Sequence, residues 1–225
     1  MLFLSIALHS VPKVRLSTCL DRLMPHVRRS DLALTGGVAI QGRLAAAGYT
    51  GWRTGVADLD LVASALDAVH PSVCEVFLVS HYHVAQPGVP KFMVQLVDPV
   101  SSIRVDVFPD LVGSLARATV MQIETQHMKV LALEDILEHK VQMLSKASAA
   151  KPVDPKHAED AYALAKLLGG PTPAVAPVCL VEDVYGDDTD LFCDRCQLSL
   201  DPRFPLAPKG DVFRLLGWTG TTSCR

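Results

Sequence analysis

The chain has 225 residues, a formal net charge of −3 and 49% hydrophobic residues, which is typical of a globular protein with a sizeable core. The 21 basic and 24 acidic side chains nearly balance, which excludes a polybasic protein that binds nucleic acid through bulk charge. No stretch approaches the roughly 20 apolar residues of a membrane span, and the apolar N-terminus lacks the basic residue of a signal peptide, so we expect a cytoplasmic protein without a membrane partner.

The first half of the chain predicts two helices and five strands. Apolar residues at helical spacing predict a helix over residues 12–29, and Leu32 to Leu34 predict a short strand that leads into the turn Gly36-Gly37. A second helix is expected over 38–47, because Gly48 then supplies a helix stop. Apolar and β-branched runs predict the remaining strands, at 58–62, 75–84, 91–97 and 103–108.

The second half predicts one strand, a pair of helices and a tail. A strand-like stretch at 121–131 leads to a helix that opens at Glu134-Asp135, and a further helix is expected over 156–168. This order predicts an α+β fold with a mixed sheet flanked by helices and a C-terminal helical pair. We expect one domain over residues 1–170, followed over 171–225 by a Pro-rich linker and an irregular tail that contains cysteines.

Three aspartates interrupt strand-like apolar segments. Asp58 and Asp60 are separated by one residue, so alternation puts both on one face of a strand, with their Cα atoms about 7 Å apart. Asp106, between Val105 and Val107, could bring a third carboxylate beside them. Carboxylates do not gather on a packed sheet unless a cation compensates them. Because magnesium prefers hard oxygen ligands, we expect Mg²⁺ at these three residues.

The glycine pair precedes a predicted helix. Gly36 and Gly37 would let the backbone approach a phosphate closely, with the amides of a helix N-terminus facing the anion. The segment is not a P-loop, because no Gly-Lys-Ser/Thr follows. It is not a dinucleotide-binding fingerprint either, because Gly42 comes too late to serve as the third glycine.

The combination of these motifs resembles the nucleotidyltransferase superfamily, which includes polymerase-beta-like enzymes. The matching segments are Leu34-Thr-Gly-Gly-Val-Ala39, Asp58-Leu-Asp-Leu-Val62 and Val105-Asp-Val107, followed by Leu133-Glu-Asp-Ile-Leu-Glu-His-Lys140 and Lys156-His-Ala-Glu-Asp160. The chain is most similar to small bacterial nucleotidyltransferases related to abortive-infection type toxins, a toxin–antitoxin-like context. The resemblance covers roughly residues 30–170.

The resemblance implies a metal-dependent transfer of a nucleoside monophosphate from an NTP, such as ATP, to an acceptor that could be tRNA, a protein or a small molecule. The implied catalytic and metal-binding residues are Asp58, Asp60 and Asp106, with a two-ion magnesium site. The implied nucleotide contacts are Gly36, Gly37, Val38, Arg53 and Lys140, with Asp160 as support for Lys140 or the acceptor. Two departures stand out: the gap from Arg53 to Asp58 is longer than usual, and Val38 replaces a serine.

Other readings stay open. A non-catalytic nucleotidyltransferase-like module could bind nucleotide, RNA or a partner protein. Cys193 and Cys196 have the spacing of half a structural zinc site, while a pair of ordinary thiols is the alternative. His81 and His83 share a strand face and could be metal ligands, but no third ligand is evident nearby, so we expect them to be exposed or to contact the acceptor. His157 is expected to face solvent.

Overall fold

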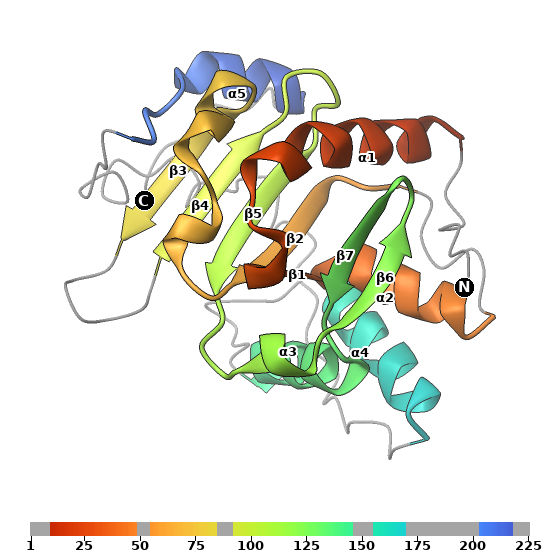
Figure 1. Cartoon of the computed structure of the whole chain (residues 1–225). Helices are drawn as coiled ribbons and strands as arrows, with labels where there is room; N and C mark the ends of the chain where they lie inside the picture. The colour runs from red at the N-terminus through yellow and green to blue at the C-terminus, as the bar shows by residue number, and fades with distance from the viewer. Residues whose placement is uncertain (1–9, 49–54, 85–91, 146–154, 170–202, 218–225) are drawn as a thin grey trace. The chain divides into compact units, whose positions relative to one another are not determined.

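The computed structural model describes residues 10–48, 55–84, 92–145, 155–169 and 203–217 (Figure 1). Within these ranges the chain divides into two compact units. The first comprises residues 1–131 and 189–225, and the second comprises residues 132–188. The domain boundary expected at residue 170 stays a prediction.

The first unit is built on a seven-stranded mixed sheet with the strand order β3-β4-β5-β2-β1-β7-β6. The pairs β2–β5 and β1–β7 are parallel, and the other neighbours are antiparallel. The strands are β1 Leu32–Thr35, β2 Asp58–Ala63, β3 Leu78–Val84, β4 Phe92–Val97, β5 Arg104–Pro109, β6 Thr119–Ile123 and β7 Gln126–Val130. The α+β fold with a mixed sheet is therefore confirmed.

Two strands differ from the expected pattern. The single strand expected at 121–131 is a hairpin, because the chain reverses at Glu124, which has a left-handed φ of 50°. Strand β3 begins three residues later than expected, because Pro71–Glu75 form a 3₁₀ turn that His70 caps by accepting a hydrogen bond from the Ser72 amide.

In this unit, helix α1 precedes β1 and helix α2 follows it. Helix α1, Ser10–Leu23, lies across one face of the sheet in Figure 1 and buries Leu16, Leu20 and Leu23. It ends before the expected residue 29 because the chain tightens into a 3₁₀ turn at Met24–His26, which contains a proline. Helix α2, Gly36–Ala46, starts directly from the end of β1.

The segment 203–217 is partly regular, so the expectation of an irregular tail is wrong there. Helix α5, Lys209–Leu216, buries Val212 against Val97 of β4. Phe204 stacks on Tyr82 of β3 with ring centroids 5.2 Å apart, and the Ala207 amide donates to the Val79 carbonyl. Residues from this segment therefore add to the hydrophobic core beside β3 and β4. Its sequence signal was weak because α5 is short and follows several prolines.

The second unit contains the expected helical pair, α3 Leu133–Ser145 and α4 Pro155–Leu167. The acids Glu134 and Asp135 occupy the first turn of α3, where the helix dipole favours negative charge. In the part of the chain that the structure describes, no helix is long and apolar enough to cross a membrane.

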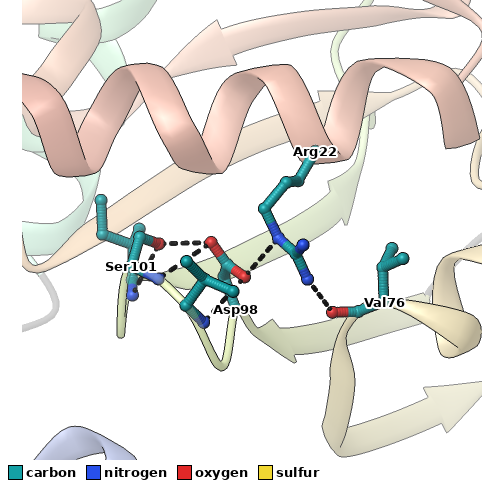
Figure 2. A network of polar contacts seen from close by, with 6 residues as sticks. Arg22, Val76, Asp98 and Ser101 are labelled. Atoms are coloured by element: carbon teal, nitrogen blue, oxygen red, sulfur yellow. Dashed lines mark hydrogen bonds and ion pairs between the residues drawn. The ribbon is translucent and has the colours of Figure 1, made fainter.

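A buried carboxylate joins α1 to the loop between β4 and β5 (Figure 2). Asp98 is fully buried and accepts hydrogen bonds from Arg22 Nε at 2.9 Å and from Ser101 Oγ at 2.6 Å. Arg22 also donates to the Val76 carbonyl at 2.8 Å, and Arg15 of α1 donates to the Ser101 carbonyl at 2.6 Å. A buried ion pair of this kind is costly to break from one side, because the remaining charge loses its partner.

We expect Asp98→Ala to lower the free energy of unfolding by about 3–5 kcal/mol, because it leaves Arg22 without its carboxylate partner. The matched control is Asp67→Ala, which removes an aspartate that pairs with Arg28 at 2.7 Å but is 68% exposed. That substitution should cost at most about 1 kcal/mol. Urea denaturation measures both, and similar losses in the two variants would contradict a structural role for the Asp98 network.

Asp110 predicts a defined pH dependence of stability. Partial burial raises the pKa of its carboxyl, but hydrogen bonds from the amides of Leu115 and Ser114 and from the Ser114 hydroxyl outweigh burial and hold the pKa below its usual value. A lowered folded-state pKa stabilises the protein above the unfolded pKa of about 3.9, and this contribution is lost as the pH falls through the folded value. Asp110→Asn should therefore be less stable than the wild type at neutral pH. In acid the two proteins should converge, and a difference that does not change with pH would show that these hydrogen bonds do not stabilise the charged form.

Candidate functional site

The three aspartates lie on one face of the sheet, on the adjacent parallel strands β2 and β5. Asp60 and Asp106 are register partners, and Asp58 is the register partner of Arg104. Residues directly opposite one another on neighbouring strands share a face, and so do residues two apart along a strand. Asp106 is 3% exposed, whereas Asp58 and Asp60 are partly accessible. The register therefore places three carboxylates side by side.

The same face carries a continuous line of polar side chains across five strands, which we call the polar row. Each member is the register partner of the next, from β1 to β3: Thr35, Asp60, Asp106, Gln95 and His81. All except Asp60 are more than nine-tenths buried. Polar groups in a sheet interior need hydrogen-bonding partners to offset their lost hydration, so a buried row of this length is unusual for a purely structural face.

Gly36 brings the start of α2 directly against the row. Its φ of +67° lies in the left-handed region, which glycine adopts without strain. A Cβ atom at this position would overlap the carboxylate of Asp60. The residue is therefore required to be glycine both by its backbone conformation and by the room that Asp60 occupies.

The first turn of α2 offers backbone amides at the same place. Thr35 is the N-cap residue and makes no side-chain capping hydrogen bond, so its hydroxyl does not occupy the amides of the first turn. Gly36, Gly37 and Val38 are the first three residues of this helix, and the Val38 side chain is buried. A helix N-terminus beside an acid row is suited to an anion that arrives together with cations.

Arg104 supplies one positive charge that two of the acids share. Its Nη2 donates to Asp58 Oδ2 at 3.3 Å, and its Nε lies 3.1 Å from Asp106 Oδ2. The Arg104 side chain is 17% exposed. Part of the positive charge that these carboxylates require is thus present within the chain itself.

Whether the acids suit a divalent metal depends on this arginine. Three carboxylates on one face are the hard oxygen donors that Mg²⁺ prefers, and the chemistry of the set fits the ion. As they stand, however, no group of three metal-ligating side chains among the described residues is gathered around one ion position. Arg104 contacts the oxygens of Asp58 and Asp106, so a metal could use both residues only if the guanidinium moved.

Lys140 and Asp160 lie in the second unit and contact one another. Lys140 Nζ is 3.0 Å from Asp160 Oδ2 and 2.8 Å from His157 Nδ1. Asp160 is fully buried and Lys140 is only 7% exposed, so this ion pair lies in the interior of the second unit. His157, expected to face solvent, is buried in this cluster because Lys140 reaches it from the neighbouring helix. The nucleotide contact expected of Lys140 stays a prediction.

Other expected site residues fall outside the described ranges. Arg53 lies in the segment 49–54, and Cys193 and Cys196 lie in the segment 170–202. Their suggested roles in nucleotide and zinc binding stay predictions. His83 lies on β3 as a register partner of Met93.

Arg104 and Gln95 are among the residues of this face that sequence reasoning missed. Arg104 stands two positions before Asp106, so strand alternation alone would have placed it on the acid face. Gln95 gave no comparable signal, because its position beside Asp106 depends on the pairing of β4 with β5.

No protein-family model and no curated protein matches this chain. Among solved structures, the chain is similar to a "putative nucleotidyltransferase" from Thermotoga maritima, with 16% identity and a TM-score of 0.39 over 68% of this chain and 90% of the other. It is also similar to JHP933 from Helicobacter pylori, with 16% identity and a TM-score of 0.40 over 69% of this chain and 65% of the other. A "putative nucleotidyltransferase" from H. pylori gives 16% identity and a TM-score of 0.34, over 67% and 68% of the two chains. The function proposed below rests on this chain's own side chains.

The buried amide of Gln95 leads to a prediction about stability. Its Oε1 has no hydrogen-bond partner among the described residues, and Gln95 is 2% exposed. A buried acceptor without a partner costs about 1–3 kcal/mol. We expect Gln95→Met, which keeps the length of the side chain, to raise the free energy of unfolding by about 1 kcal/mol.

The control is Gln122→Met on β6, where the side-chain amide donates to the Glu124 carbonyl at 3.1 Å. This substitution removes a satisfied hydrogen bond and should leave stability unchanged or lower it. Equal destabilisation of both variants in urea denaturation would show that the Gln95 carbonyl is satisfied in solution.

Proposed function

We propose that this protein is a metal-dependent nucleotidyltransferase that moves a nucleoside monophosphate from an NTP to an acceptor hydroxyl. The observation that carries the proposal is the register of β2 and β5, which sets Asp60 beside Asp106 with Asp58 on the same face. The start of α2 lies against the same carboxylate, because Gly36 packs on Asp60. Carboxylates that could bind cations therefore lie next to backbone amides that could bind phosphate.

Different groups of the chain would bind the metal ions and the phosphates in such a transfer. Asp58, Asp60 and Asp106 would hold magnesium once Arg104 has moved, and two bound ions would steady the attacking and leaving oxygens of an in-line displacement. The amides of Gly36, Gly37 and Val38 would bind the phosphate oxygens of the triphosphate.

The reaction forms a bond from the acceptor oxygen to the α-phosphorus and breaks the bond from that phosphorus to the oxygen that bridges to the β-phosphate. Pyrophosphate leaves, and the hydroxyl proton passes to a base. Asp106 is the carboxylate in the middle of the polar row, and we assign this role to it.

The candidate acceptors are tRNA, a protein hydroxyl and a small molecule. The toxin-like context suggested by the sequence resemblance belongs to the same proposal, as do ATP as the donor and the cytoplasm as the location. Lys140 would meet the nucleotide as a positive charge held in place by Asp160.

One observation favours a second function, a non-catalytic module that binds nucleotide or a partner. Arg104 already contacts Asp58 and Asp106, so part of the negative charge on this face is compensated without a metal. A protein that had lost catalysis could keep its acids as partners of this arginine. Magnesium-dependent nucleotide binding without turnover would identify that case.

Asp58→Asn tests the catalytic proposal. Incubation with labelled ATP and magnesium, with and without cell extract, should show labelled product from the wild type. We expect the variant to lose about 10²–10³-fold in rate, the scale seen when one electrostatic group is removed from an active site. The control Asp67→Asn alters an exposed aspartate on the turn Leu66–Ala68 and should keep full activity.

Thermal unfolding of both variants separates loss of chemistry from loss of fold. Transfer by Asp58→Asn at the wild-type rate would contradict a role for the aspartate in the reaction.

A further inference from the structure

Arg104 joins two acids that the proposed reaction needs for cations. It uses a different nitrogen for each: Nη2 contacts Asp58 at 3.3 Å, and Nε contacts Asp106 at 3.1 Å. The backbone sets this arrangement, because Arg104 is the register partner of Asp58 on β5 and precedes Asp106 by two residues on the same face. The guanidinium therefore lies where its strand places it, between the two carboxylates.

The electrostatic interaction between Arg104 and Asp106 is strong because both side chains are largely buried. The Asp106 side chain is 4% exposed and that of Arg104 is 17% exposed, so solvent screens their contact less than it would a surface pair. An arginine side chain stays charged in proteins, so it does not leave these acids by losing a proton. It leaves only when another group offers its charge a comparable partner.

A guanidinium and a divalent ion cannot occupy the same carboxylate oxygens. Arg104 contacts Asp58 Oδ2 and Asp106 Oδ2, which belong to two of the three acids that we assign to magnesium. A free metal ion must therefore displace the guanidinium from these two carboxylates without offering it an anion in exchange. A metal–nucleotide complex differs, because its phosphates offer the guanidinium two parallel hydrogen bonds.

We propose that Arg104 is a built-in counter-ion that competes with divalent cations for Asp58 and Asp106, and that a triphosphate relieves the competition by accepting the guanidinium. The inference rests on the proposed function for the identity of the anion, a nucleoside triphosphate. It makes free metal a weak ligand and makes metal and nucleotide bind cooperatively. Arg104 then passes from the acids to the phosphates as the site fills.

The test measures binding of Mn²⁺ alone, by electron paramagnetic resonance or calorimetry, to the wild type and to Arg104→Met. Methionine keeps an apolar stem and removes the charge. Removal of a competitor should tighten Mn²⁺ binding, and we expect at least about a fivefold decrease in Kd, the lower end of typical coupling between two ligands.

The second measurement repeats the titration with a non-hydrolysable ATP analogue present. In the wild type the analogue should tighten Mn²⁺ binding several-fold more than it does in Arg104→Met, because only the wild type has an arginine to release. The analogue itself should bind the variant more weakly.

A matched control is Arg28→Met. Arg28 also bridges two aspartates, with Nε 3.0 Å from Asp31 and Nη2 2.7 Å from Asp67, but it is 54% exposed and away from the polar row. The substitution removes the same charge from the chain and should leave Mn²⁺ affinity unchanged. An equal gain in both variants would mean that net charge alone sets the affinity, which overturns the proposal.

Arg104→Lys keeps the experiment informative if the methionine variant does not fold. An ammonium group lacks the planar fork that reaches two acids at once, so it should compete less and give a smaller gain in Mn²⁺ affinity. Unchanged or weaker Mn²⁺ binding in the folded Arg104 variants overturns the inference, and so does the absence of Mn²⁺ binding in both of them and in the wild type. If Arg104→Met binds Mn²⁺ more tightly but the wild type transfers no nucleotide, the competition between Arg104 and the metal is supported and the proposed nucleotidyltransferase activity is rejected.

Discussion

The structure depends on one electrostatic constraint: three carboxylates share a sheet face, and one of them is almost entirely buried. Such a face is stable only when its charge is compensated, because a buried carboxylate loses hydration that a cation or several hydrogen bonds must replace. Arg104 meets this need from the adjacent position on the sheet. The contact that stabilises this face is also the one that an incoming cation would have to displace, so folding and the proposed cation binding place demands on the same carboxylate oxygens.

Much of the fold could be predicted from local sequence, and the failures have local causes. Apolar runs located β1, β2, β4 and β5 to within a residue or two, because buried strands keep their hydrophobic pattern. The β6–β7 hairpin was missed because its turn has Glu124, not glycine or asparagine, in the left-handed conformation. Helix α5 was missed because eight residues give too short a pattern to separate from a loop.

The candidate site was less accessible to sequence reasoning, because it is assembled by register. Alternation indicates that Asp58 and Asp60 share a face, but nothing local states that Asp60 lies opposite Asp106. That alignment follows from the parallel pairing of two strands separated by more than forty residues and two intervening strands. Gln95 and His81 enter the row only through two further pairings, and the bulge between Val79 and His81 shifts that register once more.

The contacts of α1 with the loop between β4 and β5 therefore affect the register of β5, which carries Asp106. Side chains alternate along a strand, so a slip of β5 by one residue would turn Asp106 away and present Val105 or Val107 in its place. Asp98 and Ser101, held by Arg22 and Arg15, fix the loop that leads directly into β5. Helix α1 contributes no side chain to the polar row, yet its contacts with this loop help to keep Asp106, rather than a valine, on the face that carries Asp58 and Asp60.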